Sequence, residues 1–392
     1  MQSRETVIVE AVRTPIGKRK GGLASVHPAD LLAVAQREVV QRGGLDPSLV
    51  GQVIGGCVGQ VGEQSFNVSR TAWLNAGLPK EVPATTVDIQ CGSGQQAVTL
   101  ATGLVASGIV GTAIGCGVES MSRIPIGSST GGEFGRPINR NYRKHYEFKT
   151  QFQAAETIAR KWGVTRADAD EFALLSQRRA AAAAAAGRFE DQITAVDAPV
   201  LDDDRKPTGE TVTISKDEGM RQTTLEALAG LKSVVGDDGV HTAGSSSQIS
   251  DGAGAVLLAA ASEASRLGLR ARATIVDSIL VGVDPELMLT GPIDATAQLL
   301  KRNGLTMSDI AIVEINEAFA SVVLAWAREF DADMDRVNPN GGAIAMGHPL
   351  GGTGAILLTK ALHELERVDG EWALVTMCCG GGLGTGTLLR RS

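Results

Sequence analysis

The sequence of 392 residues lacks several features that would point to a membrane or a nucleic acid. No apolar run reaches the length that a membrane-spanning helix needs. The segment Glu5–Glu10 is too short and too charged to be a secretory leader. The net charge of −7 argues against nucleic acid as the main partner. These absences predict a globular protein with no membrane and no nucleic-acid partner.

Cysteine is also scarce, and its spacing forms no familiar pattern. The five cysteines stand at positions 57, 91, 116, 378 and 379, an odd number with no C-x-x-C pair. Neither a disulfide framework nor a zinc site is expected from such spacing, and no metal is predicted. A reducing, cytoplasmic compartment is therefore favoured.

Glycine, by contrast, is abundant, and the two ends of the chain resemble each other. The 48 glycines cluster beside apolar runs that read as strands and beside candidate helix starts. Residues 44–54 have a counterpart in 304–314, and residues 87–90 have one in 337–340, in the same order. Strands that alternate with helices indicate parallel sheets covered by helices. The sequence therefore predicts an α/β protein built from two similar halves.

The character of the sequence changes between the two halves. Residues 127–149 are rich in Gly, Arg and Asn without apolar periodicity, and a long helix follows over 166–186, with capping signals at Thr165 and Gly187. We expect this insertion to lie over the first half, which the chain re-enters at 250–258. The predicted domains are an N-terminal half (1–119 plus 246–270), an inserted loop domain (120–245) and a C-terminal half (271–392).

Cys91 is the first candidate for chemistry. A strand-like run over 85–90 leads directly into Cys91 and a small-residue helix that opens with Gly92 and Gly94. The free amides at a helix N-terminus favour a thiolate, which makes Cys91 a candidate nucleophile. A small buried hydrophobe is the simpler alternative. A dinucleotide-binding fingerprint is excluded, because no acidic residue stands between 89 and 118 where the ribose would need one.

Two further glycine-rich segments carry candidate partners for this thiol. His348 lies within 340–354, where little bulk surrounds it, and it is the natural base for a cysteine. The other four histidines stand in loop-like or charged settings and are expected to be structural or exposed. Cys378 and Cys379 end a strand before three glycines, whose N–H groups could stabilise an oxyanion. One of these thiols is expected to react and the other to pack.

Asn316 stands in a fourth segment, between a predicted strand and an apolar helix. From the residues alone, a helix N-cap and a catalytic role are equally good interpretations of this asparagine. A phosphate-cradling loop is the alternative for the glycines after Cys379, although few residues remain there for the helix that such a loop needs.

These four segments together resemble the thiolase family, in family order and spacing over essentially the whole chain. The segments are Cys91-Gly-Ser-Gly, Asn316-Glu-Ala-Phe, Gly347-His-Pro and Cys378-x-Gly-Gly-Gly. The resemblance implies two stacked five-stranded α/β halves in a duplicated five-layer α-β-α-β-α architecture, with a loop domain inserted in the first half. It also implies a homodimer or homotetramer.

The resemblance further implies a mechanism. Cys91 attacks the keto carbon of a 3-ketoacyl-CoA after His348 takes its proton, and Cys378 acts as the second acid and base. One oxyanion hole would use His348 with a water held by Asn316, and the other the N–H groups of Cys91 and Gly380. The family holds no permanent cofactor, and CoA is a co-substrate. Residues matching the family's CoA contacts are Arg221, Ala243, Ser247, Ala318 and Phe319. The cations between 136 and 149 could help with phosphates, although a solvated or subunit-contact loop is the better interpretation.

One departure bears on the substrate. Thiolases that act on acetoacetyl-CoA carry a His-Met-Gly stretch before the Ala-Glu pair matched by Ala155-Glu156, whereas this chain has Thr150-Gln-Phe-Gln-Ala. Without that methionine a branched or bulky acyl group is expected. The residue sequences of segments 90–96 and 246–251 are most similar to those of bacterial sterol side-chain-degrading thiolases.

Three alternatives to this reading remain. A biosynthetic acetoacetyl-CoA thiolase would use the same residues. A decarboxylating ketoacyl synthase is disfavoured by the presence of Cys378. A non-catalytic acyl-CoA or lipid-binding relative should have lost Cys91, His348 or Cys378, and all three are present.

Overall fold

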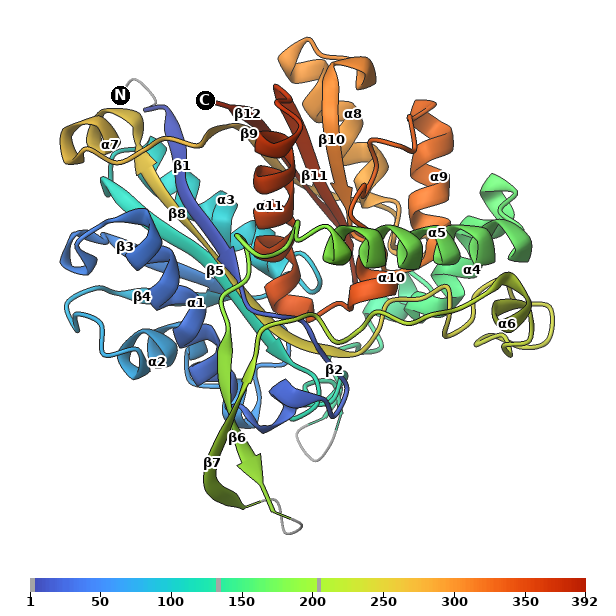
Figure 1. The fold of residues 1–392 in the computed structure, drawn as a ribbon. Helices are drawn as coiled ribbons and strands as arrows, with labels where there is room; N and C mark the ends of the chain where they lie inside the picture. Colours follow the sequence, from blue (N-terminus) through green and yellow to red (C-terminus); the bar gives the residue numbers. More distant parts are fainter. Residues whose placement is uncertain (1–3, 132–134, 203–205) are drawn as a thin grey trace.

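Ten strands form one continuous sheet that runs through the molecule. The computed structural model describes residues 4–131, 135–202 and 206–392, and Figure 1 shows the fold. The strands of this sheet are β1 (Thr6–Arg13), β2 (Gly17–Lys18), β3 (Gln52–Gly56), β4 (Ala84–Val87), β5 (Thr112–Ser120), β8 (Ser250–Ala260), β9 (Ala273–Gly282), β10 (Ile310–Ile315), β11 (Trp372–Cys379) and β12 (Leu383–Arg391). Their order is β10-β11-β12-β9-β1-β8-β5-β3-β4, and β2 pairs with β8.

The two sides of this sheet repeat one pattern. In the first half β3 is parallel to β5, and β8 is antiparallel to both β5 and β1. In the second half β10 is parallel to β11, and β12 is antiparallel to both β11 and β9. An isolated parallel bridge between Val313 and Val337 stands where β4 pairs in the first half. The predicted duplication is confirmed. The halves are joined at a short seam, where β1 and β9 pair only at Val7–Thr274 and Ile8–Ala273.

Helices cover the two halves of this sheet and fill the space between the halves. The helices of the two halves are α1 (Pro28–Gly43), α2 (Val68–Asn75), α3 (Ser93–Ala106), α7 (Ala261–Leu267), α8 (Gly291–Asn303), α9 (Ala320–Phe330), α10 (Ala343–Met346) and α11 (Leu350–Arg367). Short 3₁₀ helices cover Gly22–Ser25, Pro47–Leu49, Gly62–Gln64, Tyr142–Lys144 and Met307–Asp309. Helices α1 and α2 pack on strands of the first half, and α8 packs on strands of the second half. Helices α3 and α11 pack against each other and against strands of both halves. The five layers are those expected of a duplicated α-β-α-β-α fold.

The two central helices touch through glycine. A Cβ on Gly94, in the first turn of α3, would lie 2.5 Å from the carbonyl oxygen of Gly351 in the first turn of α11. A Cβ on Gly354 would lie 2.0 Å from the backbone nitrogen of Gln95. Neither site has room for a side chain, so the helix backbones are in direct contact at their N-termini. This contact brings the residues that precede the two helices to one side of the molecule.

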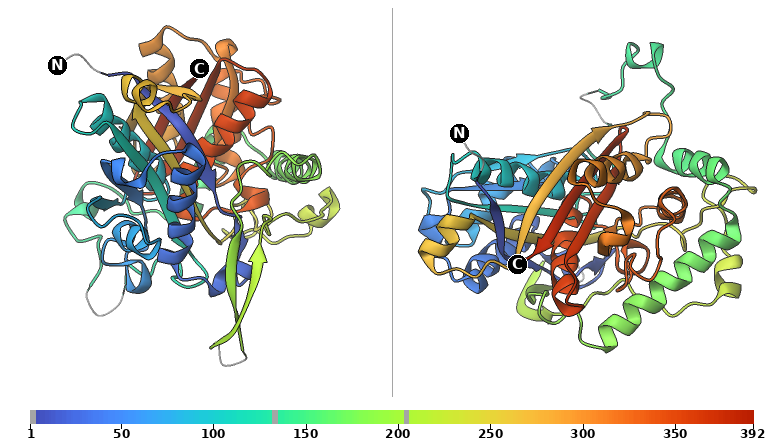
Figure 2. Two further views of the ribbon diagram at one scale, coloured as in Figure 1. Left: turned by 60° about the vertical axis from the view of Figure 1, so that its left-hand side comes forward. Right: turned by 90° about the horizontal axis from the view of Figure 1, so that it is seen from above.

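The insertion between β5 and β8 contains α4 (Gln151–Trp162), α5 (Arg166–Ala185), α6 (Leu225–Ala229) and the hairpin β6 (Val196–Leu201) to β7 (Pro207–Ile214). Helix α5 opens with the expected capping box between Thr165 and Asp168. The hairpin projects from the body of the molecule (Figures 1 and 2).

The expectation that this insertion covers the first half is wrong for its helices. Helix α4 packs on α9, and α5 packs on α10, so both helices lie against the second half. The reason is an apolar face on α4 with Ala154, Ala155 and Ile158, which is buried in one cluster with Phe319 and Val322. The hairpin instead contacts the 3₁₀ helix near the N-terminus. No helix in the described residues is long and apolar enough to cross a membrane.

Candidate active site

Cys91 sits in a tight turn between β4 and α3. Gln90, just before it, has a φ of +59°, in the left-handed region that residues other than glycine rarely adopt. The Ser93 hydroxyl stabilises this turn, because it accepts from the N–H of Ile89 at 2.9 Å and donates to the carbonyl of Gln90 at 2.6 Å. The turn leaves Cys91 one residue before the helix cap Gly92, buried at 3% exposure. Such local strain is typical of a functional residue held by its surroundings.

The electrostatic expectation for this thiol needs correction. Burial raises the pKa of Cys91 to about 11, and the N–H groups of Gly380 and of Cys91 itself only partly oppose that effect. Glu119 and Asp88 raise the pKa further. Desolvation therefore outweighs the two N–H groups, and the thiol is protonated at neutral pH. Cys91 needs a base to become a nucleophile at neutral pH.

His348 has its ring held in one tautomer. Its Nδ1 lies 2.6 Å from the hydroxyl of Thr353, and that hydroxyl donates to the carbonyl of Pro349 at 2.8 Å. We assign the ring proton to Nδ1, because the Thr353 hydroxyl then donates to the carbonyl of Pro349 and accepts from the ring. Nε2 is then the acceptor nitrogen of the ring. Burial lowers the pKa of His348 to about 4, so the ring is neutral at physiological pH.

Asn316 faces the acceptor nitrogen of this ring. It follows directly on β10, and its Nδ2 lies 3.3 Å from His348 Nε2. Its Oδ1 is buried and has no hydrogen-bond partner among the described residues. The N-cap interpretation is wrong, because α9 begins at Ala320 and its cap position is Phe319. The amide is thus available for a ligand rather than for a helix.

Glu317, beside Asn316, is a structural carboxylate. It is buried and accepts hydrogen bonds from the Ser176 hydroxyl at 2.7 Å, the Asn338 amide at 2.9 Å and the N–H of Ile344 at 3.1 Å. These bonds tie the segment after β10 to α5 and to the segment around α10. Glu317 therefore fixes the backbone that carries Asn316.

The two thiols at the end of β11 point to opposite faces, as neighbours on a strand must. Cys378 is buried in the same apolar cluster as Ala318 and Phe319. Cys379 lies on the other side, so close to Gly92 that a Cβ there would be 2.6 Å from its sulfur. Burial raises the pKa of both thiols, and the neighbouring Cys91 raises it further. At neutral pH Cys378 is therefore protonated and able to donate.

The structure brings together three of the five residues that match CoA contacts of the family, namely Ser247, Ala318 and Phe319. The N–H of Ser247 donates to the carbonyl of Ala318 at 2.9 Å, and Ser246 bridges to Phe319. Arg221 and Ala243 are exposed on the inserted segment. In the basic loop, the ammonium group of Lys149 lies 3.6 Å from the carboxylate of Glu286.

Sequence reasoning missed Thr353. It stands five residues after His348 in the glycine-rich segment, and only the rotation of this position about the axis of α11 shows that its hydroxyl reaches the ring.

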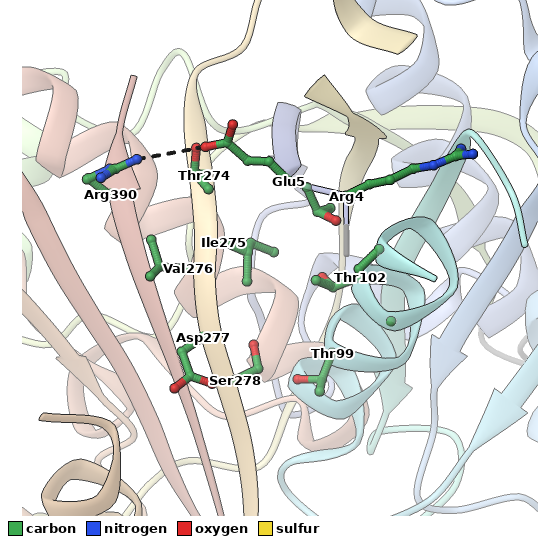
Figure 3. Close-up of a pocket in the computed structure, with 13 residues that line it drawn as sticks. Arg4, Glu5, Thr99, Thr102, Thr274, Ile275, Val276, Asp277, Ser278 and Arg390 are labelled. Carbon is green, nitrogen blue, oxygen red and sulfur yellow. Dashed lines mark hydrogen bonds and ion pairs between the residues drawn. The ribbon is translucent and has the colours of Figure 1, made fainter. Parts of the chain in front are cut away.

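A groove of about 520 Å³ lies elsewhere, between β9 and α3 (Figure 3), where Arg390 faces Glu5 at 3.8 Å. None of the predicted site residues lines this groove. The described residues contain no cluster of side chains suited to hold a metal ion.

Comparisons with known proteins cover the whole chain. The thiolase N-terminal domain matches residues 6–262, and the thiolase C-terminal domain matches residues 269–391. The chain is 46% identical to a steroid 3-ketoacyl-CoA thiolase of Mycobacterium tuberculosis, covering 99% of this chain and 94% of that one. It is 44% identical to a beta-ketoadipyl-CoA thiolase of Acinetobacter baylyi, covering 99% and 100%.

Solved structures agree with these matches. The acetyl-CoA acetyltransferase of Bacillus anthracis superposes with a TM-score of 0.91 at 34% identity, and human mitochondrial 3-ketoacyl-CoA thiolase with a TM-score of 0.89 at 34% identity. Both matches cover 100% of each chain. With its duplicated sheet, its paired central helices and both family domains matched end to end, the chain belongs to the thiolase family of acetyl-CoA C-acyltransferases.

Proposed function

We propose that Cys91, His348, Asn316, Cys378 and Gly380 catalyse the CoA-dependent cleavage of a 3-ketoacyl-CoA to acetyl-CoA and a shortened acyl-CoA. The observation that carries this proposal is the buried imidazole of His348, which burial keeps neutral and which Thr353 and Asn316 orient from its two ring nitrogens. A base of this kind is what a protonated, buried nucleophilic thiol requires.

In the first half of the reaction, His348 Nε2 takes the proton of Cys91, and the thiolate attacks the keto carbon at C3. The N–H groups of Gly380 and Cys91 face the sulfur and hold the oxyanion that forms beside it. The C2–C3 bond then breaks, and its electron pair leaves as the enolate of acetyl-CoA. His348, now protonated, and a water on Asn316 Oδ1 hold the enolate oxygen, while the Cys378 thiol protonates C2.

In the second half, the Cys378 thiolate takes the proton of an incoming CoA thiol. The CoA sulfur attacks the acyl group on Cys91, again beside the N–H groups of Gly380 and Cys91. Collapse of this intermediate expels the Cys91 sulfur, which recovers its proton from His348. Cys91, His348 and Cys378 all return to their starting protonation states, and one 3-ketoacyl-CoA and one CoA have given two acyl-CoA products.

The CoA chain is proposed to run over the contact between Ser247 and the Ala318–Phe319 pair, with Ala243 beside it. Ala318 and Phe319 are buried in one apolar cluster with Cys378, and the N–H of Ser247 donates to the carbonyl of Ala318, which supports a path for pantetheine toward the reacting sulfurs. Arg221, exposed on the insertion, is proposed to face the nucleotide end. CoA is a co-substrate here rather than a bound cofactor.

A homo-oligomer is also proposed. Strand β4 is at one end of the sheet, so one of its edges has no partner strand among the described residues, and Phe66 beside it is 94% exposed.

The acyl group is proposed to be bulky or branched. The stretch that replaces the family's His-Met-Gly forms the cap and first turn of α4, where Phe152 lies edge-on to Phe319 with ring centroids 5.1 Å apart. Phe152 is 41% exposed, so its ring is an accessible apolar wall beside the Cys378 cluster. The names of the relatives, which include steroid and beta-ketoadipyl substrates, support an acyl group larger than acetoacetyl.

The test is the CoA-dependent loss of the 3-ketoacyl-CoA enolate absorbance with three substrates at equal concentration. These are acetoacetyl-CoA, 3-ketoadipyl-CoA and a sterol-side-chain 3-ketoacyl-CoA. A larger kcat/KM for the sterol-derived substrate supports the proposal, and a preference for 3-ketoadipyl-CoA would move the substrate to dicarboxylic chains. A preference for acetoacetyl-CoA would favour the biosynthetic alternative. Turnover of none would favour a non-catalytic acyl-CoA-binding protein.

A further inference from the structure

A buried ion pair lies behind the candidate active site and has no part in the mechanism above. Lys360 Nζ donates to Glu314 Oε2 at 2.7 Å and to the carbonyl of Gly341 at 2.7 Å. Lys360 is 1% exposed and Glu314 is fully buried. Removing two charges from water costs more than their attraction normally returns, so a pair like this is weak evidence for stability alone. Its position suggests another use.

The ion pair and the reacting groups come from the same two elements. Glu314 is on β10, and Asn316 follows two residues later, on the same face of the chain. Lys360 and Thr353 are both on α11, seven residues apart, and so on the same side of that helix. Two contacts therefore link the end of β10 to α11. One is Glu314 to Lys360, and the other is Asn316 to His348, whose ring Thr353 holds.

A small cavity of about 10 Å³ lies beside these two links, and among its mainly apolar lining residues are the polar side chains of Asn316, Thr353 and Lys360. This is about the room that one water molecule needs. An ammonium group has three N–H donors, and the structure gives Lys360 two acceptors among the described residues. Asn316 Oδ1 and Glu314 Oε1 are buried without a partner. Two residues that line the cavity therefore have unused hydrogen-bonding capacity, Lys360 as a donor and Asn316 Oδ1 as an acceptor.

We propose that Lys360, held by Glu314, is a positioning residue for Asn316. It ties α11 to β10 and, through one water in the cavity, holds the Asn316 amide with its Nδ2 toward His348. Asn316 Oδ1 has two lone pairs, so it can accept from this water and from the water at the oxyanion. Lys360 touches no substrate atom in this arrangement. The inference deepens the proposed function and rests on it for the role of Asn316.

The experiment compares Lys360→Met, Asn316→Ala and the double variant of both, with kcat given per folded enzyme. If Lys360 acts through Asn316, Lys360→Met alone should lower kcat about 10-fold with KM unchanged, and should change it less than about 2-fold once Asn316 is gone. Equal losses in both backgrounds would overturn the proposal, because residues that act independently give additive effects. An unchanged kcat in Lys360→Met would overturn it as well.

Two controls separate positioning from folding. The double variant Lys360→Met with Glu314→Gln leaves no unpaired buried charge, so it should fold even if Lys360→Met does not, and should still show the loss of kcat. Arg272→Met breaks a similar pair with Glu366 (2.6 Å) away from the site, and should lower stability while leaving kcat unchanged. A normal kcat in the neutral double variant would overturn the proposal.

A second readout does not depend on the substrate. The rate at which iodoacetamide alkylates Cys91, followed by peptide mass spectrometry, reports how well His348 is placed to take the proton. The same non-additive pattern is expected for this rate. A protein that shows the pattern in alkylation but cleaves no 3-ketoacyl-CoA would contradict the proposed function alone. A protein that is an active thiolase with additive alkylation effects would contradict this inference alone.

Discussion

The imidazole Nδ1 of His348 lies 2.6 Å from the hydroxyl of Thr353, and this contact fixes the orientation of the ring. The same hydroxyl lies 2.8 Å from the carbonyl of Pro349, and with its hydrogen assigned to that carbonyl the ring donates through Nδ1. The acceptor Nε2 then meets the Nδ2 of Asn316, so the tautomer also fixes which end of that amide faces the ring.

Replacing Thr353 by valine should lower kcat about 10- to 100-fold, because the ring loses the acceptor that holds its tautomer and orientation. Thr359→Val is the matched control. Thr359 makes the same backbone contact, to Ala355 at 2.8 Å, on the same helix but does not reach the histidine. Steady-state thiolysis with both variants gives the comparison. Equal activities would show that the hydroxyl does not position His348.

Replacing Cys91 by serine should lower thiolysis at least about 10³-fold while leaving the fold and CoA binding intact, since the hydroxyl is a far weaker nucleophile than the thiolate. Cys116→Ala is the control, because Cys116 is buried in β5 and contacts Gln36 rather than the site. Thiolysis and CoA binding by calorimetry are measured for both. Full turnover by Cys91→Ser would remove this residue from the mechanism.

The stability of the protein should fall as the pH drops through the range set by His348. Burial lowers its pKa from 6.5 to about 4, so the unfolded chain binds a proton at a higher pH than the folded chain does. The stabilisation is complete above about pH 6.5 and is lost between there and about pH 4. For this one group it amounts to about 3 kcal/mol.

Urea denaturation of the wild type and of His348→Gln at several pH values tests this effect. His363, whose pKa is also lowered to about 4 by burial, should leave a smaller slope in the variant. Identical slopes in the two proteins would mean that His348 is not held neutral by the fold.

Replacing Gly94 by alanine should destabilise the protein by about 2–4 kcal/mol, because its Cβ would lie 2.5 Å from the carbonyl oxygen of Gly351. Gly103 is on the same helix with no atom within 4 Å of its would-be Cβ, so Gly103→Ala should be neutral or stabilise by up to about 1 kcal/mol. Free energies of unfolding in urea distinguish the two. A tolerated Gly94→Ala would mean that the central helices can move apart.

The parts of this molecule that depend on local sequence could be predicted well. The turn at Cys91, the duplicated order of strands and helices and the capping box at Thr165 are all local patterns, and the structure contains each of them. Features that depend on burial or on residues distant in sequence could not be predicted. The sign of the pKa shift of Cys91 follows from desolvation, which no local pattern reports.

The same limit applies to Thr353 and to the insertion. The Thr353 side chain reaches His348 only because α11 begins directly after Pro349 and turns this position toward the ring. Helix α4 lies on the second half because its apolar face is buried with Phe319 and Val322, which are distant in sequence. A pattern local to the insertion does not identify these partners. Asn316 was ambiguous for the opposite reason, because two good local interpretations existed and only the start of α9 at Ala320 separates them.

The backbone contact between α3 and α11 has a consequence for the division of labour between the halves. Cys91 stands two residues before the first residue of α3, and His348 stands two residues before the first residue of α11. Each half therefore contributes one of these two side chains from the matching end of its central helix. The pair exists only where the two halves meet, so neither half taken alone holds both groups.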